Sequence, residues 1–202
     1  MARPRTISDE DMLAAARTVF LEQGAGASTA VIAERLGVSQ AALFKRFGTK
    51  RDLMVAALVP PKVPPFLPHL DAGPDPSRPC LEQLEEIGHH VLDFFRDMVP
   101  AIMVLSTCGS DPKELLAEHP VPPPLQAMMG MAGWIQRAID LGMLRGGDPV
   151  HLAMTFLGSL HIRAFFAAFT RTPMTDDDVD IHVTAAADAL WYGLAPSEET
   201  PS

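Results

Sequence analysis

The sequence predicts a chain built of helices, and three observations lead to this fold class. Capping residues followed by acidic ones recur at helix starts, as in Ser8-Asp9-Glu10-Asp11. Apolar residues then recur at spacings of three and four, which is the period of one helix face. Glycines and prolines follow where such stripes stop. With 202 residues, 48% of them hydrophobic, the chain has room for a small N-terminal domain, the head, and a larger C-terminal domain, the body.

The first helix is expected to begin after Ser8 and to end near Gly24, because a helical stripe of apolar residues lies between them. Two cations, Arg3 and Arg5, precede this helix. They form either a basic arm that touches phosphates or an ordinary solvated terminus.

Residues 28–50 have the layout of two helices joined by a tight turn. Ser28 is placed to cap the first helix and Gly37 to end it, since glycine adopts the left-handed conformation most easily. Ser39 is placed to cap the second helix, whose inward side carries Leu43. The residues expected on the outward side of that helix are Gln40, Ala41, Ala42, Lys45 and Arg46.

Such an outward side suits a helix that lies in the major groove of DNA. Small side chains permit close approach, glutamine can pair with adenine, and cations meet bases or phosphates. After it, Thr49 and Asp52 form the pattern of a capping box that opens another helix. The free amides at that start, with Lys50 beside them, would suit a phosphate. The sequence therefore predicts a helix-turn-helix that reads DNA.

This part of the chain resembles the N-terminal DNA-binding domain of TetR-type transcriptional regulators. The shared pattern covers about a quarter of the chain and reads Gly26-x-Ser28-x-x-x-Ile32-Ala33-x-x-Leu36-Gly37-Val38-Ser39-x-x-x-Leu43-Phe44-x-x-Phe47-x-x-Lys50-x-x-Leu53. The resemblance implies an all-α chain with a three-helix DNA-binding head and a C-terminal helical domain for ligand binding and dimerisation. It also implies a dimer on a palindromic double-stranded DNA operator, usually a repressor.

The resemblance assigns roles to individual residues of the head. It implies base reading by Gln40, Ala41, Ala42 and Lys45 and backbone positioning by Ser28, Arg46 and Lys50. The full set of predicted DNA-binding residues is Ser28, Ser39, Gln40, Ala41, Ala42, Phe44, Lys45, Arg46, Thr49 and Lys50.

The chain departs from the family pattern at Phe44, where the family usually has a tyrosine whose hydroxyl reaches a phosphate. Arg46 stands where the family has another aromatic residue, and its charged fork would replace that phosphate contact. The alternatives are that Phe44 only packs and that the cations are solvated surface charges.

The charge distribution agrees with a head that faces DNA. Residues 1–59 hold 8 Lys+Arg against 6 Asp+Glu, a net of +2, while the remainder holds 8 against 19, a net of −11. A duplex would repel the acidic part, and a pI of about 5.1 argues against general coating of nucleic acids. Because the positive excess is small, affinity would need a dimer with two half-sites.

Prolines predict where the head ends. The fourth helix is expected from Thr49 to about Val59, followed by a Pro-rich stretch. The expected domains are therefore a head over residues 1–59, a connector over 60–79, and an effector-binding and dimerisation domain over 80–202. In the family the fourth helix usually carries the effector signal. Here the connector either transmits that signal or is a surface loop without such a role.

The body is expected to contain four long helices and a short piece over residues 113–118. The first runs over residues 81–99, where Pro100 kinks or ends it, and the others are expected over 125–144, 148–170 and 175–193. Residues 152–162 are apolar nearly all round, so they should be covered on more than one face. Small residues in the last two helices would let helices approach closely, as in the four-helix dimer seam of the family, so the resemblance implies a homodimer seam there, the alternative being a monomer core.

Methionine and aromatic residues gather in the central part of the body. They tolerate varied apolar shapes, so a small hydrophobic or aromatic effector is expected there, although each of them can equally be core packing. The predicted pocket residues are His90, Phe94, Met98, Met103, Met128, Met131, Trp134, His161 and Phe165.

Other chemistries find little support in the sequence. No histidines lie three or four apart, and no dinucleotide fingerprint, P-loop or nucleophile elbow is present, so no catalytic residue, metal or cofactor is predicted. No signal peptide or membrane-spanning segment is expected, and the two cysteines suit a reducing cytoplasm. The alternatives are a DNA-binding or interaction protein without an effector, and an enzyme that uses the body pocket.

Overall fold

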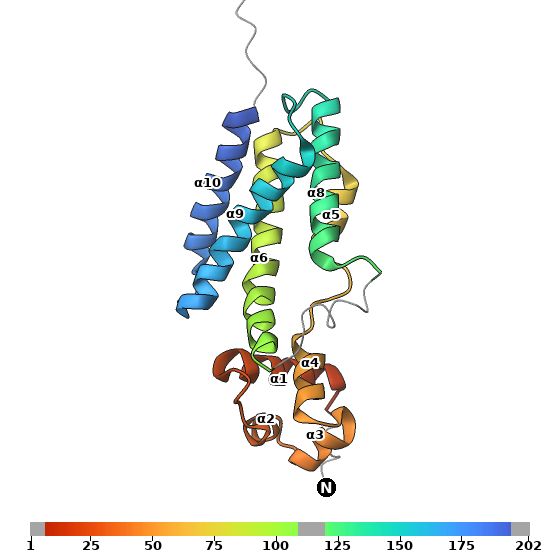
Figure 1. The fold of residues 1–202 in the computed structure, drawn as a ribbon, viewed down its shortest axis with the longest axis vertical. Coiled ribbons are helices and arrows are strands. Elements are labelled where there is room, and N and C mark those ends of the chain that lie inside the picture. The colour runs from red at the N-terminus through yellow and green to blue at the C-terminus, as the bar shows by residue number, and fades with distance from the viewer. Residues whose placement is uncertain (1–6, 109–119, 195–202) are drawn as a thin grey trace, which may run out of the picture. The chain divides into compact units, whose positions relative to one another are not determined.

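The computed structural model describes residues 7–108 and 120–194, and every regular element in them is a helix (Figure 1). The prediction of an all-helical chain is therefore confirmed. The chain forms two compact units. The first unit holds residues 7–59 and 100–108, and the second holds residues 60–99 and 120–194. The short piece expected over residues 113–118 lies outside the described residues.

Four short helices form most of the first unit. They are α1 (Asp9–Gln23), α2 (Thr29–Leu36), α3 (Gln40–Phe47) and α4 (Lys50–Leu58). Each begins at a predicted capping residue whose hydroxyl accepts a hydrogen bond from a backbone N–H of the first turn. At Ser8 and Thr49 the acidic residue three positions later completes a capping box. These polar signals set the helix boundaries before any packing occurs.

The first unit buries one apolar cluster, to which all four of its helices contribute. Two further members of this cluster, Ala101 and Leu105, come from the end of α6 (Cys80–Ser106), far along the chain. Both are fully buried. The head therefore completes its core with a helix that begins in the second unit.

The helix α6 continues through Pro100, which is where the chain passes from the second unit to the first. The sequence left open whether this proline kinks or ends the helix. The structure shows that the helix does not end at Pro100. Proline lacks the N–H that would bond to the carbonyl of Arg96 and costs a helix interior about 3 kcal/mol. The burial of Ala101 and Leu105 in the core of the first unit offsets that local cost.

The second unit consists of five helical segments, and their boundaries differ in part from the prediction. They are α5 (Leu67–Ala72), the first part of α6, α8 (Pro123–Asp140), α9 (Pro149–Thr170) and α10 (Asp176–Leu194). The helix α8 ends before the predicted residue 144, because Gly142 takes a left-handed φ of 70°. The predicted cap Asp148 accepts hydrogen bonds from the first-turn amides of α9.

The helix α6 is packed closely by its neighbours in the second unit. A Cβ atom at Gly88 of α6 would lie 2.7 Å from Cγ1 of Val183 in α10 and 3.4 Å from the ring of Phe156 in α9. The ring of Phe94 on α6 meets the ring of Phe66, the residue that precedes α5, with centroids 5.5 Å apart. The segment over residues 60–79 thus contains a helix that packs on the body.

The contribution of α6 to the head core can be measured. Replacing Leu105→Ala removes a fully buried side chain and should lower the free energy of unfolding by about 2–5 kcal/mol. Hydrogen exchange of the α1 and α4 amides should then become faster. The matched control is Leu141→Ala, since that leucine is 52% exposed and its loss should change stability by less than about 0.5 kcal/mol. Unchanged exchange in α1 and α4 would contradict the assignment of Leu105 to the head core.

Candidate DNA-binding site

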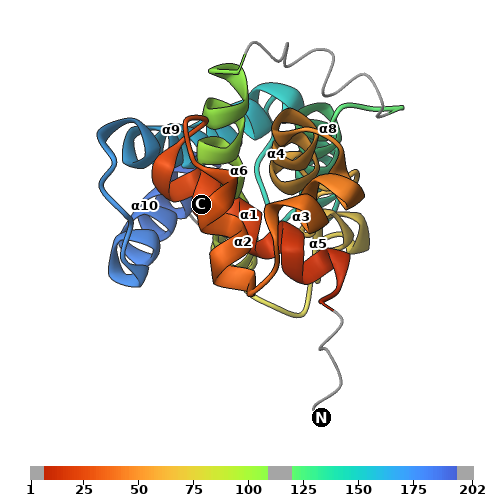
Figure 2. The ribbon, with the colours of Figure 1, turned by 90° about the horizontal axis from the view of Figure 1, so that it is seen from below.

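The helices α2 and α3 form the predicted helix-turn-helix (Figure 2). Gly37 closes α2 in the left-handed conformation, with φ 66° and ψ 30°. The N–H of Val38 donates to the carbonyl of Ala33 over 3.0 Å, and the Val38 side chain packs against the head core. Ser39 then caps α3, because its hydroxyl accepts from the N–H of Ala42 at 3.2 Å.

The outward side of α3 is exposed, as the helical spacing predicts. Leu43 anchors the helix with no exposed surface, and Phe47 is half-buried behind it. The surface of α3 that would face DNA is its reading face, which consists of Gln40, Ala41, Ala42, Phe44 and Lys45. Ala42 is half-buried and the other members of the face are exposed. Phe44 keeps 37% of its surface exposed, so it is not a core residue.

Arg46 does not share the direction of the reading face. Its Nη1 donates to the carbonyl of Ile7 at 2.8 Å and to the carboxylate of Asp9 at 2.7 Å. Three residues after the buried Leu43, Arg46 lies on the flank of α3 that faces α1. The sequence could not reveal this contact, because Asp9 and Arg46 are far apart in the chain.

The start of α4 is less open to an anion than its sequence suggests. The Thr49 hydroxyl donates to the carboxylate of Asp52 at 2.7 Å, and that carboxylate also accepts from the Thr49 N–H at 2.9 Å. These hydrogen bonds hold the pKa of Asp52 below its usual value, so the carboxylate stays ionised at neutral pH. An incoming phosphate would meet this negative charge beside the half-buried Lys50.

The residues predicted for an effector pocket fall in several environments. Met131 and Trp134 of α8 are core residues with at most 1% of their surface exposed. His90 stacks on His69 with ring centroids 4.2 Å apart, and His161 meets the ring of Phe95 edge-on. Phe165 of α9 stacks on the exposed Phe169, and Phe94 lies between Phe66 and Phe95. Met103 belongs to the first unit, whereas the other predicted residues belong to the second.

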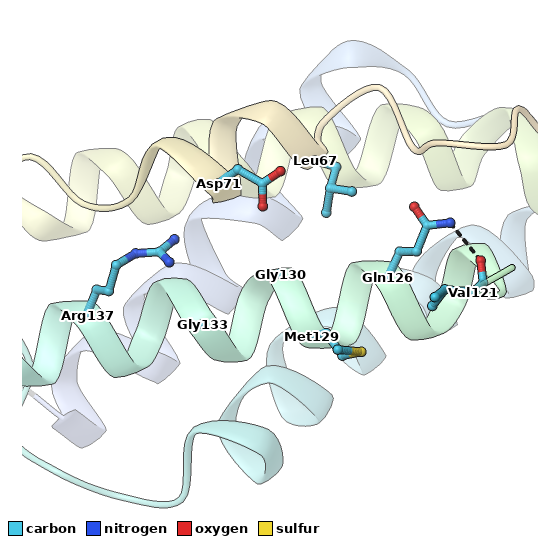
Figure 3. A pocket seen from close by; sticks show the side chains of 8 residues that line it. All are labelled: Leu67, Asp71, Val121, Gln126, Met129, Gly130, Gly133 and Arg137. Atoms are coloured by element: carbon cyan, nitrogen blue, oxygen red, sulfur yellow. Dashed lines mark hydrogen bonds between the residues drawn. The ribbon is translucent and has the colours of Figure 1, made fainter.

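A groove with a volume of about 290 Å³ lies between α5 and α8 (Figure 3). Sequence reasoning missed it, and none of the residues predicted for the pocket lines it. Above Gly133 the groove is open, since a Cβ there would meet only the Arg137 guanidinium, at 3.7 Å. The lining residues are Leu67, Asp71, Val121, Gln126, Met129, Gly130, Gly133 and Arg137.

One end of this groove carries two opposite charges. Arg137 of α8 is held in place because its Nη2 donates to the carbonyl of Leu70 over 2.5 Å. Its Nε and Nη1 meet no acceptor among the described residues. Asp71 of α5 turns its carboxylate toward the same space (Figure 3) and has no ion pair or hydrogen bond in the described part of the chain. The groove therefore offers donors and an acceptor beside an apolar wall that includes Leu67 and Met129.

The helices α9 and α10 lie side by side (Figure 1) and leave apolar side chains uncovered. One side of α9 is buried, whereas Met154, Ile162, Phe166 and Phe169 are 45–65% exposed on it. On α10 the exposed apolar residues are Ile181 and Tyr192, at 71% and 75%.

The length and composition of α9 would also allow it to cross a membrane, and only 28% of its most apolar window is buried. Core helices of proteins without a membrane span pass the same test, so the expectation of no spanning segment is not contradicted. Helices that form contacts between subunits are also long, apolar and partly unburied in a single chain. The length and composition of α9 are therefore weak evidence for a membrane span.

Residues 12–57 match the family model described as bacterial regulatory proteins, tetR family. No curated protein sequence gives a significant match. The matched residues include α2, the turn and α3 in full, so the family match falls on the helix-turn-helix itself.

Solved structures share the fold over nearly the whole chain. One is a TetR-family regulator from Mesorhizobium loti, with a TM-score of 0.67, 17% identity, and coverage of 93% of this chain and 96% of that chain. PfmR from Thermus thermophilus has a TM-score of 0.62 and 19% identity, covering 92% and 99%. The flavonoid-responsive regulator FrrA has a TM-score of 0.53 and 21% identity, covering 93% and 96%.

Identities this low establish the common fold alone, and the family match supplies the relationship for the head. The head carries a capped helix-turn-helix with an exposed reading face, and the second unit carries the helical body of the neighbouring structures. Residues 12–57 of the chain are accordingly a DNA-binding domain of the tetR family of bacterial regulatory proteins, and the second unit shares the helical fold of solved TetR-family regulators.

Proposed function

We propose that this regulator is a homodimeric repressor that leaves a palindromic operator when a small apolar or aromatic molecule binds its second unit. The observation that carries the proposal is the exposed reading face of α3, in a head that the family match marks as DNA-binding. We assign no catalysis to the chain. The cytoplasm suits it, because Cys80 and Cys108 are free thiols and burial raises the pKa of Cys80 to about 11.

The reading face offers few polar groups to DNA. Gln40 can pair with an adenine and Lys45 can reach a guanine or a phosphate, while the alanines between them allow close approach to the groove. One head with so few contacts would bind weakly, which favours two heads on one operator. In a two-fold dimer the recognition helices would meet half-sites about 34–36 Å apart, one turn of the duplex.

The reading face can be tested with matched double variants. Gln40→Ala with Lys45→Ala should raise the Kd for a duplex selected from a random pool by at least about 100-fold, because each base contact is worth about 1–3 kcal/mol. The control, Gln136→Ala with Lys62→Ala, removes the same residue types from the second unit and should leave the Kd unchanged. Fluorescence anisotropy at several salt concentrations measures both. Equal binding by the two double variants would contradict the assigned reading face.

The apolar faces of α9 and α10 support the dimer. A side chain such as Phe166, 55% exposed on a helix whose opposite side is packed in the body, gains most by burial against a second copy. Small exposed residues, Gly158 of α9 with Ala185 and Ala189 of α10, would let the partner helices approach closely. A two-fold seam places the same faces of both copies against each other, which suits an apolar surface without charge pairing.

Charge placed on this face should separate the protomers. Phe166→Glu is expected to weaken dimerisation by at least about 100-fold, since it buries an unpaired carboxylate in the seam. The control is Met129→Glu, because Met129 is equally exposed at 58% but lies on α8. Sedimentation velocity gives the oligomeric state, and anisotropy gives the accompanying loss of DNA affinity. A Phe166→Glu protein that remains dimeric would rule out this seam.

The groove between α5 and α8 supports a small-molecule effector. Its volume is at the lower end of the range for ligand sites, about 300–1,000 Å³, and it joins an apolar wall to a few polar groups. Structural neighbours include a protein named as flavonoid-responsive, and an aromatic molecule of modest size would suit this groove.

Contacts exist through which such a ligand would act on the head. The segment that includes α5 meets α6 through the ring pairs of Phe66 with Phe94 and His69 with His90. The end of α6 in turn supplies Leu105 to the head core. In this proposal a ligand that displaces α5 shifts the population of α6 conformations, and through α6 the fit of the heads to DNA.

Variants that fill the groove can distinguish a regulator that senses a small molecule from one that has no effector. A panel of small apolar and aromatic compounds, with and without a carboxyl group, should contain members that raise the Tm of the wild type and release DNA. Gly133→Leu should abolish both effects, because its side chain enters the open space above the helix. Gly133→Ala, the control, adds one methyl without a clash and should keep them. If no compound stabilises the wild type, a DNA-binding protein without this effector site is supported instead.

A further inference from the structure

Arg46 makes an unusual set of contacts for a cation on a recognition helix. A single nitrogen, Nη1, lies 2.8 Å from the carbonyl of Ile7, 2.7 Å from the carboxylate of Asp9 and 3.6 Å from the sulfur of Met12. All three partners belong to the start of α1 or to the residues just before it. The contact therefore ties the second half of α3 to the point where the chain enters α1.

The remaining donors of Arg46 are unused. A guanidinium carries five N–H groups, and Nη1 has two of them, which the carbonyl of Ile7 and the carboxylate of Asp9 can accept. The Nε group and both hydrogens of Nη2 meet no acceptor among the described residues, and the side chain is 36% exposed. Arginine is the residue that can hold a protein acceptor on one nitrogen while presenting the others, in one plane, to a phosphate.

The ion pair of Arg35 with Glu22 shows a different use of the same residue type. There both Nη1 and Nη2 of the arginine face one carboxylate, at 3.5 Å and 2.6 Å. The side chains of that pair are 41% and 49% exposed, which is comparable with Arg46. Arg35 thus directs both terminal nitrogens at a protein partner, whereas Arg46 directs only Nη1 at the described residues and leaves Nη2 without an acceptor among them.

We propose that Arg46 is a two-sided residue: Nη1 fixes the start of α1 against α3, and Nε with Nη2 binds a phosphate of the operator. The first side positions the recognition helix and the point from which the N-terminal residues begin. The second side adds one charge-assisted contact per half-site. The Asp9 carboxylate orients the guanidinium for that contact, so the two sides act together. This inference rests on DNA binding alone and not on the proposed effector or dimer seam.

The test uses the full chain, a duplex that the wild type selects from a random pool, and two readouts. The dependence of Kd on salt counts phosphate contacts, because each contributes a slope of about 0.9 in log Kd against log salt concentration. Hydrogen exchange at the Asp11 and Met12 amides, measured without DNA, reports the tie between α3 and α1. The variants are Arg46→Gln, Arg46→Lys and Asp9→Asn, with Arg35→Gln as the control for losing an equally exposed paired arginine.

Each variant should move a different readout. Arg46→Gln should raise the Kd at least tenfold, lower the salt slope by about 0.9 per half-site and speed exchange. Arg46→Lys should lower the slope equally but keep exchange slow, since a compact ammonium that stays on Asp9 has no planar fork with which to reach a phosphate on its other side. Asp9→Asn should speed exchange, and its effect on Kd should be smaller in the Arg46→Gln background than alone. Arg35→Gln should leave the slope unchanged.

Specific results would overturn the proposal. An unchanged salt slope in Arg46→Gln would make Arg46 a structural tie only, and wild-type behaviour of Arg46→Lys would show that the fork is not needed. Additive effects of Asp9→Asn and Arg46→Gln on Kd would remove the orienting role of Asp9. Failure of the wild type to select any duplex would instead contradict DNA binding itself, and this inference with it.

Discussion

The burial of Leu105 inside the head core is the contact on which the rest of the structure depends. Four helices of 8 to 15 residues are too short to be stable by themselves, so the head relies on tertiary burial of their apolar sides. The end of α6 contributes to that burial with Ala101 and Leu105. The same helix begins among α5, α9 and α10, where Gly88 and Phe94 are packed. The stability of the head thereby depends in part on a helix that begins in the second unit.

Some polar side chains of the head form capping hydrogen bonds that stabilise the fold, and others stay exposed where they can contact DNA. The hydroxyls of Ser39 and Thr49 accept backbone N–H groups and so define where α3 and α4 begin. The carboxylate of Asp52 takes a backbone N–H that an anion would otherwise use. The groups that remain for DNA are few, chiefly Gln40 and Lys45 on α3. A surface this sparse, on a chain with a net charge of −9, supports the proposal that two heads share one operator.

The second unit leaves large apolar side chains exposed on α9 and α10. Residues of α9 such as Phe156 and Leu160 are buried, yet Phe166 and Phe169 stay more than half exposed in a single chain. The sequence shows that α9 is apolar nearly all round, but not which side faces outward. Only the packing of α9 against α6, α8 and α10 decides that, by using one side of the helix and leaving the other.

The sequence by itself determined most of the helices, their caps and the outward side of α3, because capping and a period of 3.6 residues act between neighbours in the chain. It also located the turn at Gly37 correctly. It missed α5, which lies inside the predicted Pro-rich connector. Tertiary structure alone decided the direction of Arg46, the continuation of α6 through Pro100 and the position of the groove beside Gly133. Each of these depends on contacts between residues distant in sequence: Arg46 with Asp9, Leu105 with the core of α1–α4, and α8 with α5. Local spacing carries no information about such pairs, since packing sets them only once the helices have met.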